Sequence, residues 1–81
     1  MSKDEIQKQV RETVANAASM EVDALRNDQD LIRDLSLDSL AVYEIVVDLE
    51  AAFDMQIADE DVERLHTIHD IVAYVEAGIA S

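Results

Sequence analysis

Residues 39–53 read Ser-Leu-Ala-Val-Tyr-Glu-Ile-Val-Val-Asp-Leu-Glu-Ala-Ala-Phe, a segment that contains neither Gly nor Pro. Its apolar residues recur at steps of three or four, which is the repeat of one face of an α-helix. The residues of this apolar stripe are Val42, Ile45, Val46, Leu49 and Phe53. Asp38 stands immediately before the segment, and aspartate is a preferred N-cap residue. The sequence therefore predicts an amphipathic helix over about residues 39–53, whose stripe must pack against other elements.

Helix signals also occur on both sides of this segment. Ser2 and Glu5 form an S-x-x-E capping box ahead of regularly spaced apolar residues, which predicts a first helix over about residues 3–18. Further along, the run Asp59-Glu60-Asp61 favours the start of a short helix, because acidic side chains stabilise helix N-termini. Thr67 is the expected N-cap of a last amphipathic helix.

The segment from Ser19 to Leu37 has no sustained helical or strand repeat. Long loops in small domains are uncommon and are often functional. Its scattered apolar residues indicate that the segment packs against the helices rather than extending into solvent. The sequence predicts an all-α fold, a small four-helix bundle with a long first loop and a short third helix, in a single domain over residues 1–81.

Length and composition exclude several classes of protein. A chain of 81 residues buries only roughly 60% of its unfolded surface, which leaves little room for a deep catalytic pocket beside the core. The absence of Cys excludes disulfides and thiolate metal sites. The longest apolar run, Ile71 to Val75, is far shorter than the roughly 20 residues of a membrane-spanning helix. Residues 1–5 lack the basic and apolar regions of a signal peptide, so we expect a cytoplasmic protein.

The acidic charge is strong and unevenly distributed. The chain has a net charge of −13. Residues 1–33 hold seven acids and five bases, a net charge of −2, whereas residues 34–81 hold twelve acids and one base, a net charge of −11. Nucleic acid is therefore excluded as a partner, because phosphate contacts require Lys and Arg. The acidic half instead favours docking of basic proteins.

The sequence Asp34-Leu35-Ser36-Leu37-Asp38-Ser39-Leu40 joins the long loop to the second helix. An isolated Asp-Ser-Leu is most often an N-cap and a first turn. Here, in a small acidic helical chain, residues 34–40 resemble the D-L-G-x-D-S-L pattern of acyl carrier proteins. Residues 44–50, 53–54 and 57–60 resemble the E-L-V-x-x-L-E, F-D and I-P-D-E segments of the same family, so the resemblance extends over nearly the whole chain.

The resemblance implies that Ser39 accepts a covalent 4′-phosphopantetheine arm from coenzyme A, attached by a phosphopantetheinyl transferase. The thiol at the end of the arm would carry acyl groups as thioesters. A phosphodiester on Ser39 would lie at a helix N-terminus, which favours an anion. Asp38 and Leu40 flank the attachment point and belong to the same site. No G-x-S-x-G sequence surrounds Ser39, so we expect a carrier without catalytic residues rather than an enzyme.

Helix spacing predicts a partner surface, and the resemblance implies a place for the acyl chain. Four residues on the outward side of the second helix are predicted to bind partners, and we call them the docking strip: Leu40, Glu44, Val47 and Asp48. The expected partners are acyl-transfer, ketosynthase and related enzymes with basic docking patches, and we expect a monomer. The residues expected by resemblance to line an acyl chain, which are otherwise core residues, are Val46, Leu49, Ile57, Val62, Leu65 and Ile71.

Departures from the family pattern concern the loop and the pathway. Ser36 stands where the family has Gly, so a positive φ there would be costly. Ala41, Ala51 and Ala52 replace acids that are common in fatty-acid carriers. The sequence therefore leaves open whether the chain serves fatty-acid biosynthesis or specialised, polyketide-type biosynthesis.

The sequence also bears on other functions. A carrier of aminoacyl or peptidyl groups is disfavoured because the G-G-[HD]-S sequence is absent. The alternative of a different class is an acidic helical adaptor that binds basic proteins without a prosthetic group. His66 and His69 supply too few ligands for zinc, so no metal site is predicted.

Overall fold

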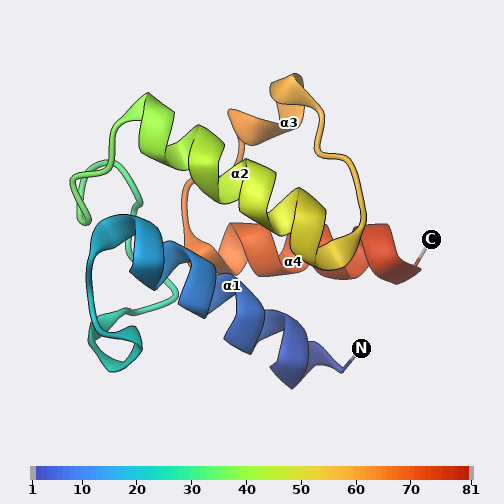
Figure 1. Cartoon of the computed structure of the whole chain (residues 1–81), viewed down its shortest axis with the longest axis horizontal. Coiled ribbons are helices and arrows are strands. Elements are labelled where there is room, and N and C mark those ends of the chain that lie inside the picture. Colours follow the sequence, from blue (N-terminus) through green and yellow to red (C-terminus); the bar gives the residue numbers. More distant parts are fainter. Residues whose placement is uncertain (1, 81) are drawn as a thin grey trace.

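The computed structural model of the chain describes residues 2–80 and shows four α-helices and one short 3₁₀ helix (Figure 1). Their bounds are α1, Lys3–Ala18; η1, Val22–Ala24; α2, Ser39–Phe53; α3, Asp59–Val62; and α4, Ile68–Ala80. The predicted all-α class, the long first loop and the short third helix are confirmed. The sequence does not predict η1. No helix among residues 2–80 combines the length and the apolar character needed to cross a lipid bilayer.

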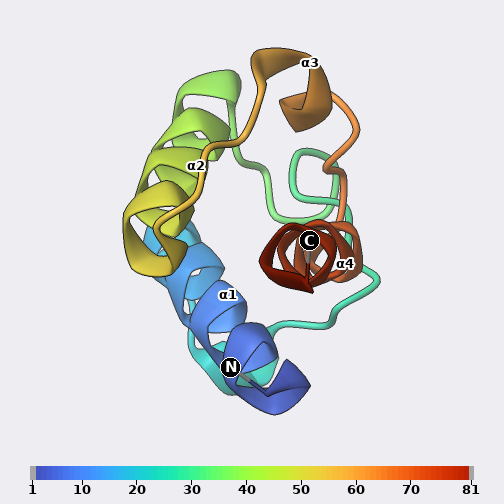
Figure 2. The same ribbon diagram turned by 90° about the vertical axis from the view of Figure 1, so that its right-hand side faces the viewer.

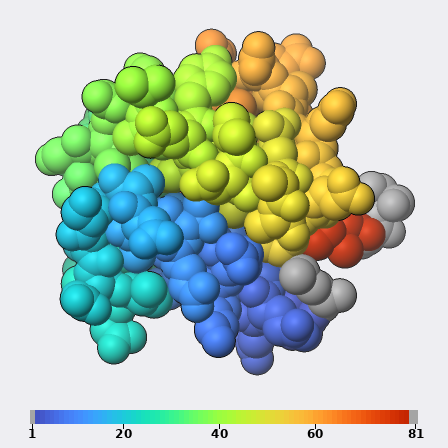
Figure 3. Space-filling model, in the orientation of Figure 1, coloured from blue at the N-terminus to red at the C-terminus, as the bar shows by residue number. Residues whose placement is uncertain are grey.

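Of the three long helices, α1 packs against the other two, α2 and α4. The backbone of α1 comes close to both α2 and α4, whereas α2 and α4 approach each other less closely. Figure 2 shows α3 on the opposite side of the molecule from α1. In the space-filling view, α2 covers the upper part and α1 the lower part of one face (Figure 3). Buried side chains of the long loop and of α3, among them Leu31 and Val62, belong to the same core as those of α2 and α4.

The helix starts follow the local capping signals of the sequence. The backbone N–H of Glu5 donates to Ser2 Oγ at 3.2 Å, and the Glu5 side chain accepts in return from the Ser2 backbone. At the start of α4, the Asp70 N–H donates to Thr67 Oγ1 at 3.1 Å, and the Thr67 N–H donates to Asp70 Oδ2 at 3.2 Å. Each pair satisfies helix N–H groups that would otherwise lack partners.

The hydrophobic core draws on every long helix and on the long loop. A fully buried Leu, Ile or Val side chain stabilises a fold by about 1.5–3 kcal/mol. The most completely buried side chains are Val10 and Val14 of α1, Leu31 of the loop, Ile45 and Leu49 of α2, and Ile68, Ile71 and Val75 of α4. Because Leu31 is buried among helix residues, the loop forms part of the core.

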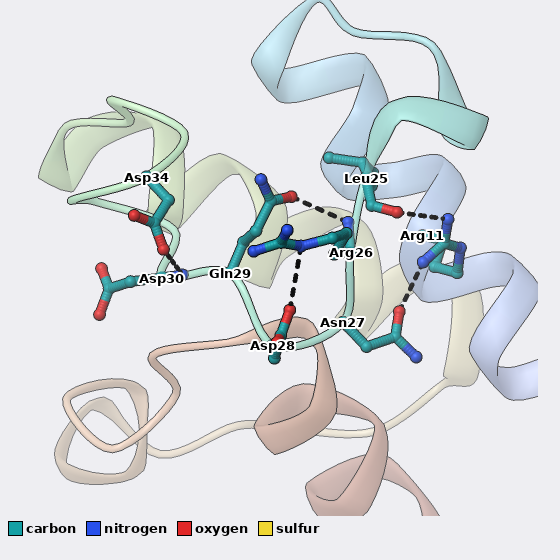
Figure 4. A network of polar contacts seen from close by, with 8 residues as sticks. All are labelled: Arg11, Leu25, Arg26, Asn27, Asp28, Gln29, Asp30 and Asp34. Atoms are coloured by element: carbon teal, nitrogen blue, oxygen red, sulfur yellow. Dashed lines mark hydrogen bonds and ion pairs between the residues drawn. The ribbon is translucent and has the colours of Figure 1, made fainter.

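One arginine fixes the first half of the long loop to α1. Arg11 donates from Nη1 to the Asn27 side chain and from Nη2 to the Leu25 carbonyl at 3.0 Å (Figure 4). Its Nη2 also donates to the Val22 carbonyl at 2.8 Å. These bonds satisfy backbone carbonyls at and just after η1, and a charged donor makes each of them stronger than a neutral bond. The predicted packing of this segment against the helices is confirmed.

Backbone hydrogen bonds join the second half of the loop to the start of α4. The Leu31 N–H donates to the His66 carbonyl at 2.8 Å, and the His69 N–H donates to the Asn27 carbonyl at 3.0 Å. Asp30 and Thr67 form an isolated antiparallel bridge at the same place. The loop is therefore held between α1 and α4, and this brings residues 30–32 close to residues 65–67.

Candidate functional site

Ser39 is the first residue of α2 and is exposed to solvent. Asp38 precedes it as the N-cap, and the Asp38 carboxylate accepts the Ala41 N–H at 2.8 Å, as the sequence predicts. The next residue, Leu40, is 68% exposed. A short polar cap thus leaves the Ser39 hydroxyl at the positive end of a fifteen-residue helix.

The backbone turns sharply just before this helix. Leu37 is buried, and its N–H donates to the Leu31 carbonyl at 3.1 Å, which fixes the entry to α2. Ser36 has a φ of 59°, in the left-handed region. The strain expected from a serine in the family's glycine position is therefore present, at a cost of roughly 1–2 kcal/mol.

Asp30 organises the loop on the other side of the site. One carboxylate oxygen, Oδ1, accepts the N–H groups of Ile32 and Arg33, both at 2.9 Å. The bond from Arg33, followed by that from Ile32, lowers the pKa of Asp30 below its ordinary value. The Asp34 carboxylate in turn accepts the Asp30 N–H at 2.7 Å (Figure 4). This turn was not predicted from the sequence, although Asx turns, in which an Asp side chain accepts a nearby backbone N–H, are a known local pattern.

A cavity of about 240 Å³ opens beside Ser39. Its walls come from α2, from the loop, and from α3 with the residues that follow it. The lining residues are Ser39, Val42 and Tyr43; Asp30, Leu31 and Ile32; and Val62, Glu63, Leu65 and His66. Three segments that are distant in the sequence therefore meet at the start of α2.

The six residues expected to line an acyl chain divide into two groups. Val62 and Leu65 line the cavity beside Ser39. The other four belong to the buried core and do not line that cavity: Val46, Leu49, Ile57 and Ile71. The structure thus brings two of the predicted residues to the cavity beside Ser39 and packs the other four in the core.

The docking strip lies on the exposed side of α2, as expected from the helix repeat. Leu40 and Val47 are 68% and 59% exposed, and Glu44 and Asp48 are exposed beside them. These four residues and Tyr43 line a shallow depression of about 370 Å³. Tyr43, which the strip prediction did not include, borders both this depression and the cavity.

A tyrosine holds α3 against α4. The Tyr74 hydroxyl donates to Asp61 Oδ2 at 2.7 Å, and this bond to a carboxylate raises the pKa of Tyr74. Glu50 of α2 accepts the Ile57 N–H at 2.9 Å and fixes the connection that leads into α3. Because Val62 of α3 forms part of the cavity wall, these two bonds help to set the shape of the cavity.

The exposed Ser39 hydroxyl is the group at this site that can form an ester. No hydrogen bond within the described residues joins the Ser39 hydroxyl to a base. Within the same part of the chain, no group of three or more His, Cys, Asp or Glu side chains is placed to hold a metal ion. An exposed hydroxyl at a helix N-terminus, beside a small cavity, fits a phosphate ester followed by a flexible organic chain.

Known proteins match nearly the whole chain. The family model described as "Phosphopantetheine attachment site" matches residues 8–75. An acyl carrier protein from Exiguobacterium sp. is 43% identical over 76 residues, which cover 94% of this chain and 96% of the relative. Acyl carrier protein 2 from Pseudomonas aeruginosa is 38% identical over 76 residues, with the same coverage of the two chains. The solved structure of an acyl carrier protein from Enterococcus faecalis is similar with a TM-score of 0.82 and 31% identity, covering 96% of this chain and 99% of that one.

Proposed function

The chain belongs to the acyl carrier protein family and carries acyl groups on a covalently attached 4′-phosphopantetheine, and we propose that Ser39 is the residue that bears this group. The thiol at the end of the prosthetic group supplies the chemistry, because it forms thioesters with acyl groups. The protein is a carrier and not an enzyme. The alternative of an adaptor without a prosthetic group is not supported by the family match.

The placement of Ser39 carries this proposal. The hydroxyl of Ser2 is engaged in the capping box of α1. Ser19 follows the C-terminus of α1, where the helix dipole disfavours an anion, and Ser36 lies in a loop. Ser39 combines exposure with a helix N-terminus and a neighbouring cavity.

Two features at the start of α2 favour a phosphate ester on Ser39. Asp38 engages the Ala41 N–H and fixes the first turn, while the helix dipole favours the negative charge on Ser39. A base within this chain is not required, because the phosphopantetheinyl transferase supplies the group that takes the Ser39 proton. Leu40 offers an exposed apolar contact directly beside the attachment point.

We propose that the docking strip binds the transferase and the enzymes that load and use the cargo. Glu44 and Asp48 place negative charge beside the apolar side chains of Leu40 and Val47, a pattern that complements a basic patch around an apolar spot. Arg64 is the one base among residues 34–81, so little positive charge opposes such partners. The expected users are acyl-transfer, ketosynthase and related enzymes of fatty-acid or polyketide-type biosynthesis. The monomeric state and the cytoplasmic location stay predictions from the sequence.

The attachment site is tested by mass spectrometry. The protein is incubated with coenzyme A, Mg²⁺ and a phosphopantetheinyl transferase of broad specificity. The parent is expected to gain the mass of one phosphopantetheine on a peptide that contains Ser39, and Ser39→Ala is expected to gain none. Ser39 is exposed, so its removal changes stability by less than about 0.5 kcal/mol. Ser36→Gly is the matched control and keeps the mass gain.

Two results would refute the assignment. One is a parent protein that gains no mass under conditions in which another carrier is modified. The other is modification of folded Ser39→Ala. The intact mass of the protein purified from its native cells would additionally identify the cargo, and thereby separate fatty-acid from polyketide-type use.

A further inference from the structure

Three hollows adjoin one another on the surface around Ser39. The cavity that Ser39 lines shares Tyr43 with the shallow depression along the docking strip. On its other side the cavity adjoins a third hollow, an open depression of about 410 Å³, with which it shares most of the lining of that hollow. The residues that line the third hollow are Asp30, Ile32, Arg33 and His66. An enzyme that reaches the Ser39 hydroxyl therefore meets a surface that extends in two directions, along α2 and over the loop.

Exposed apolar side chains are concentrated on this surface. Among residues 2–80, the large apolar side chains that are exposed are Ile32, Leu40, Tyr43, Val47 and Ile79. Each of them except Ile79 borders one of the three hollows. A specific protein interface uses about 20–30 residues on each side, far more than the docking strip supplies, so the surface around Ser39 has to extend beyond α2. Ile32, which is 56% exposed, marks the loop as the direction of that extension.

The charges at the loop end of this surface differ from those of the docking strip. The carboxylates of Asp30 and Asp34 are engaged by the loop backbone, since Asp30 Oδ1 accepts two N–H groups and Asp34 accepts a third (Figure 4). The Arg33 guanidinium contributes to the lowered pKa of Asp30, but it is exposed and forms no hydrogen bond or ion pair within residues 2–80. Arg33 is therefore available to a partner, with a charge opposite to that of the docking strip.

We propose that the phosphopantetheinyl transferase that modifies Ser39 binds across the cavity, with a basic patch on the docking strip and an acidic side chain on Arg33, next to an apolar contact with Ile32. The inference rests on the proposed attachment at Ser39 and adds a second contact region, the loop patch, which consists of Ile32 and Arg33. Because the two ends carry opposite charges, a complex in the reversed orientation would bring like charges together at both ends.

Contacts on both sides of Ser39 account for a fixed orientation of the enzyme. A contact confined to the docking strip would leave the enzyme free to rotate about the axis of α2. The loop patch lies on the other side of the cavity, so a second contact there removes this freedom. Transfer of a group to one particular hydroxyl requires such an orientation, because the reacting atoms have to be held together and aligned.

The test measures kcat/KM for modification of the protein by the transferase purified from its native cells, with coenzyme A and Mg²⁺, at about 10 and 200 mM salt. Arg33→Glu is expected to lower kcat/KM by roughly three- to tenfold at low salt and by less at high salt, since exposed ion pairs are weak and screened. Arg33→Gln removes the charge without reversing it and is expected to give a smaller loss. Ile32→Ala is expected to lower kcat/KM by about threefold at both salt concentrations, because the lost contact is apolar.

Two matched controls separate the loop patch from general effects of charge and apolar surface. Arg26→Glu makes the same change of charge in the same loop, and Arg26 is exposed, pairs with Asp28 at 3.4 Å and lines none of the three hollows. Ile79→Ala removes an exposed isoleucine near the C-terminus of α4. Ile79→Ala is expected to keep the parent kcat/KM, and Arg26→Glu to keep or exceed it, because added negative charge attracts a basic patch. Urea unfolding midpoints close to that of the parent verify that the variants are folded.

Four results would overturn the inference. A faster reaction of Arg33→Glu than of the parent would show that the enzyme presents basic groups to the loop. If the Arg33 and Ile32 variants react like their controls, the contact is confined to α2, and the attachment at Ser39 still stands. If Ile32→Ala alone is slower, the acidic counterpart of Arg33 is absent. If the parent gains no phosphopantetheine on Ser39, the proposed attachment itself fails, and the parent reaction alone reveals that failure.

Discussion

Replacement of Ser36 by glycine should stabilise the fold, because the backbone at this position has a φ of 59°. An L-residue in the left-handed region costs roughly 1–2 kcal/mol, whereas glycine adopts it freely. The Ser36 side chain is exposed and makes no hydrogen bond within residues 2–80, so its removal loses no contact. Any change in the free energy of unfolding therefore comes from the backbone conformation at residue 36 and not from packing or polar contacts.

The expected increase in the free energy of unfolding is smaller than the strain energy that is relieved. Glycine increases the conformational entropy of the unfolded chain, which offsets about 0.5–1 kcal/mol of the gain. The net stabilisation is then about 0.5–1 kcal/mol. With a urea dependence of about 1 kcal/mol per M for so small a domain, the unfolding midpoint should rise by about 0.5–1 M. The melting temperature should rise by about 4–8 °C for each kcal/mol.

Urea unfolding followed by circular dichroism measures this effect. Ser36→Ala serves as the matched control, because it removes the hydroxyl but keeps the Cβ atom that causes the strain. The control should show no gain over the parent. An equal rise for both variants would attribute the effect to the hydroxyl, and no rise for Ser36→Gly would contradict the positive φ itself.

Three further predictions concern charge. Glu44→Lys combined with Asp48→Lys should slow modification by the transferase more at low than at high salt, since charges at the rim of an interface act mainly on association rate, and equal rates at low salt would place the docking surface elsewhere. The net charge of −11 in residues 34–81 should make the melting temperature rise between about 10 and 200 mM salt, and a constant value would show that the core outweighs the repulsion. The lowered pKa of Asp30 means that its carboxylate adds stability above its unfolded pKa of about 3.9, and that this stability is lost as the pH falls through the folded pKa. The free energy of unfolding of Asp30→Asn, measured with urea, should therefore fall less steeply than that of the parent from about pH 5 to about pH 3. Parallel pH profiles for the two proteins would assign the acid sensitivity to other carboxylates.

The sequence determined the helices because their signals are local. The Ser2 and Glu5 capping box, the Asp38 cap and the Thr67 cap each join atoms three residues apart, so the pattern and the contact coincide in the sequence. The outward side of α2 followed from the helix repeat in the same way, since Leu40 and Val47 lie opposite the buried residues of that helix. Ser39 could be singled out because its motif spans adjacent residues.

The tertiary structure decided what surrounds Ser39. Arg11 reaches carbonyl groups 11 and 14 residues away, and no local pattern indicates which carbonyls an arginine will bind. The cavity requires Leu31, Ser39 and Leu65 to meet, and their meeting depends on the backbone bond from Leu31 to the His66 carbonyl. Apolar spacing marks Leu49 and Leu65 alike as buried, because burial follows from hydrophobicity and period. Leu65 lines the cavity because the loop is bonded to the carbonyl of the next residue, His66, and this long-range contact is not visible in the spacing of apolar residues.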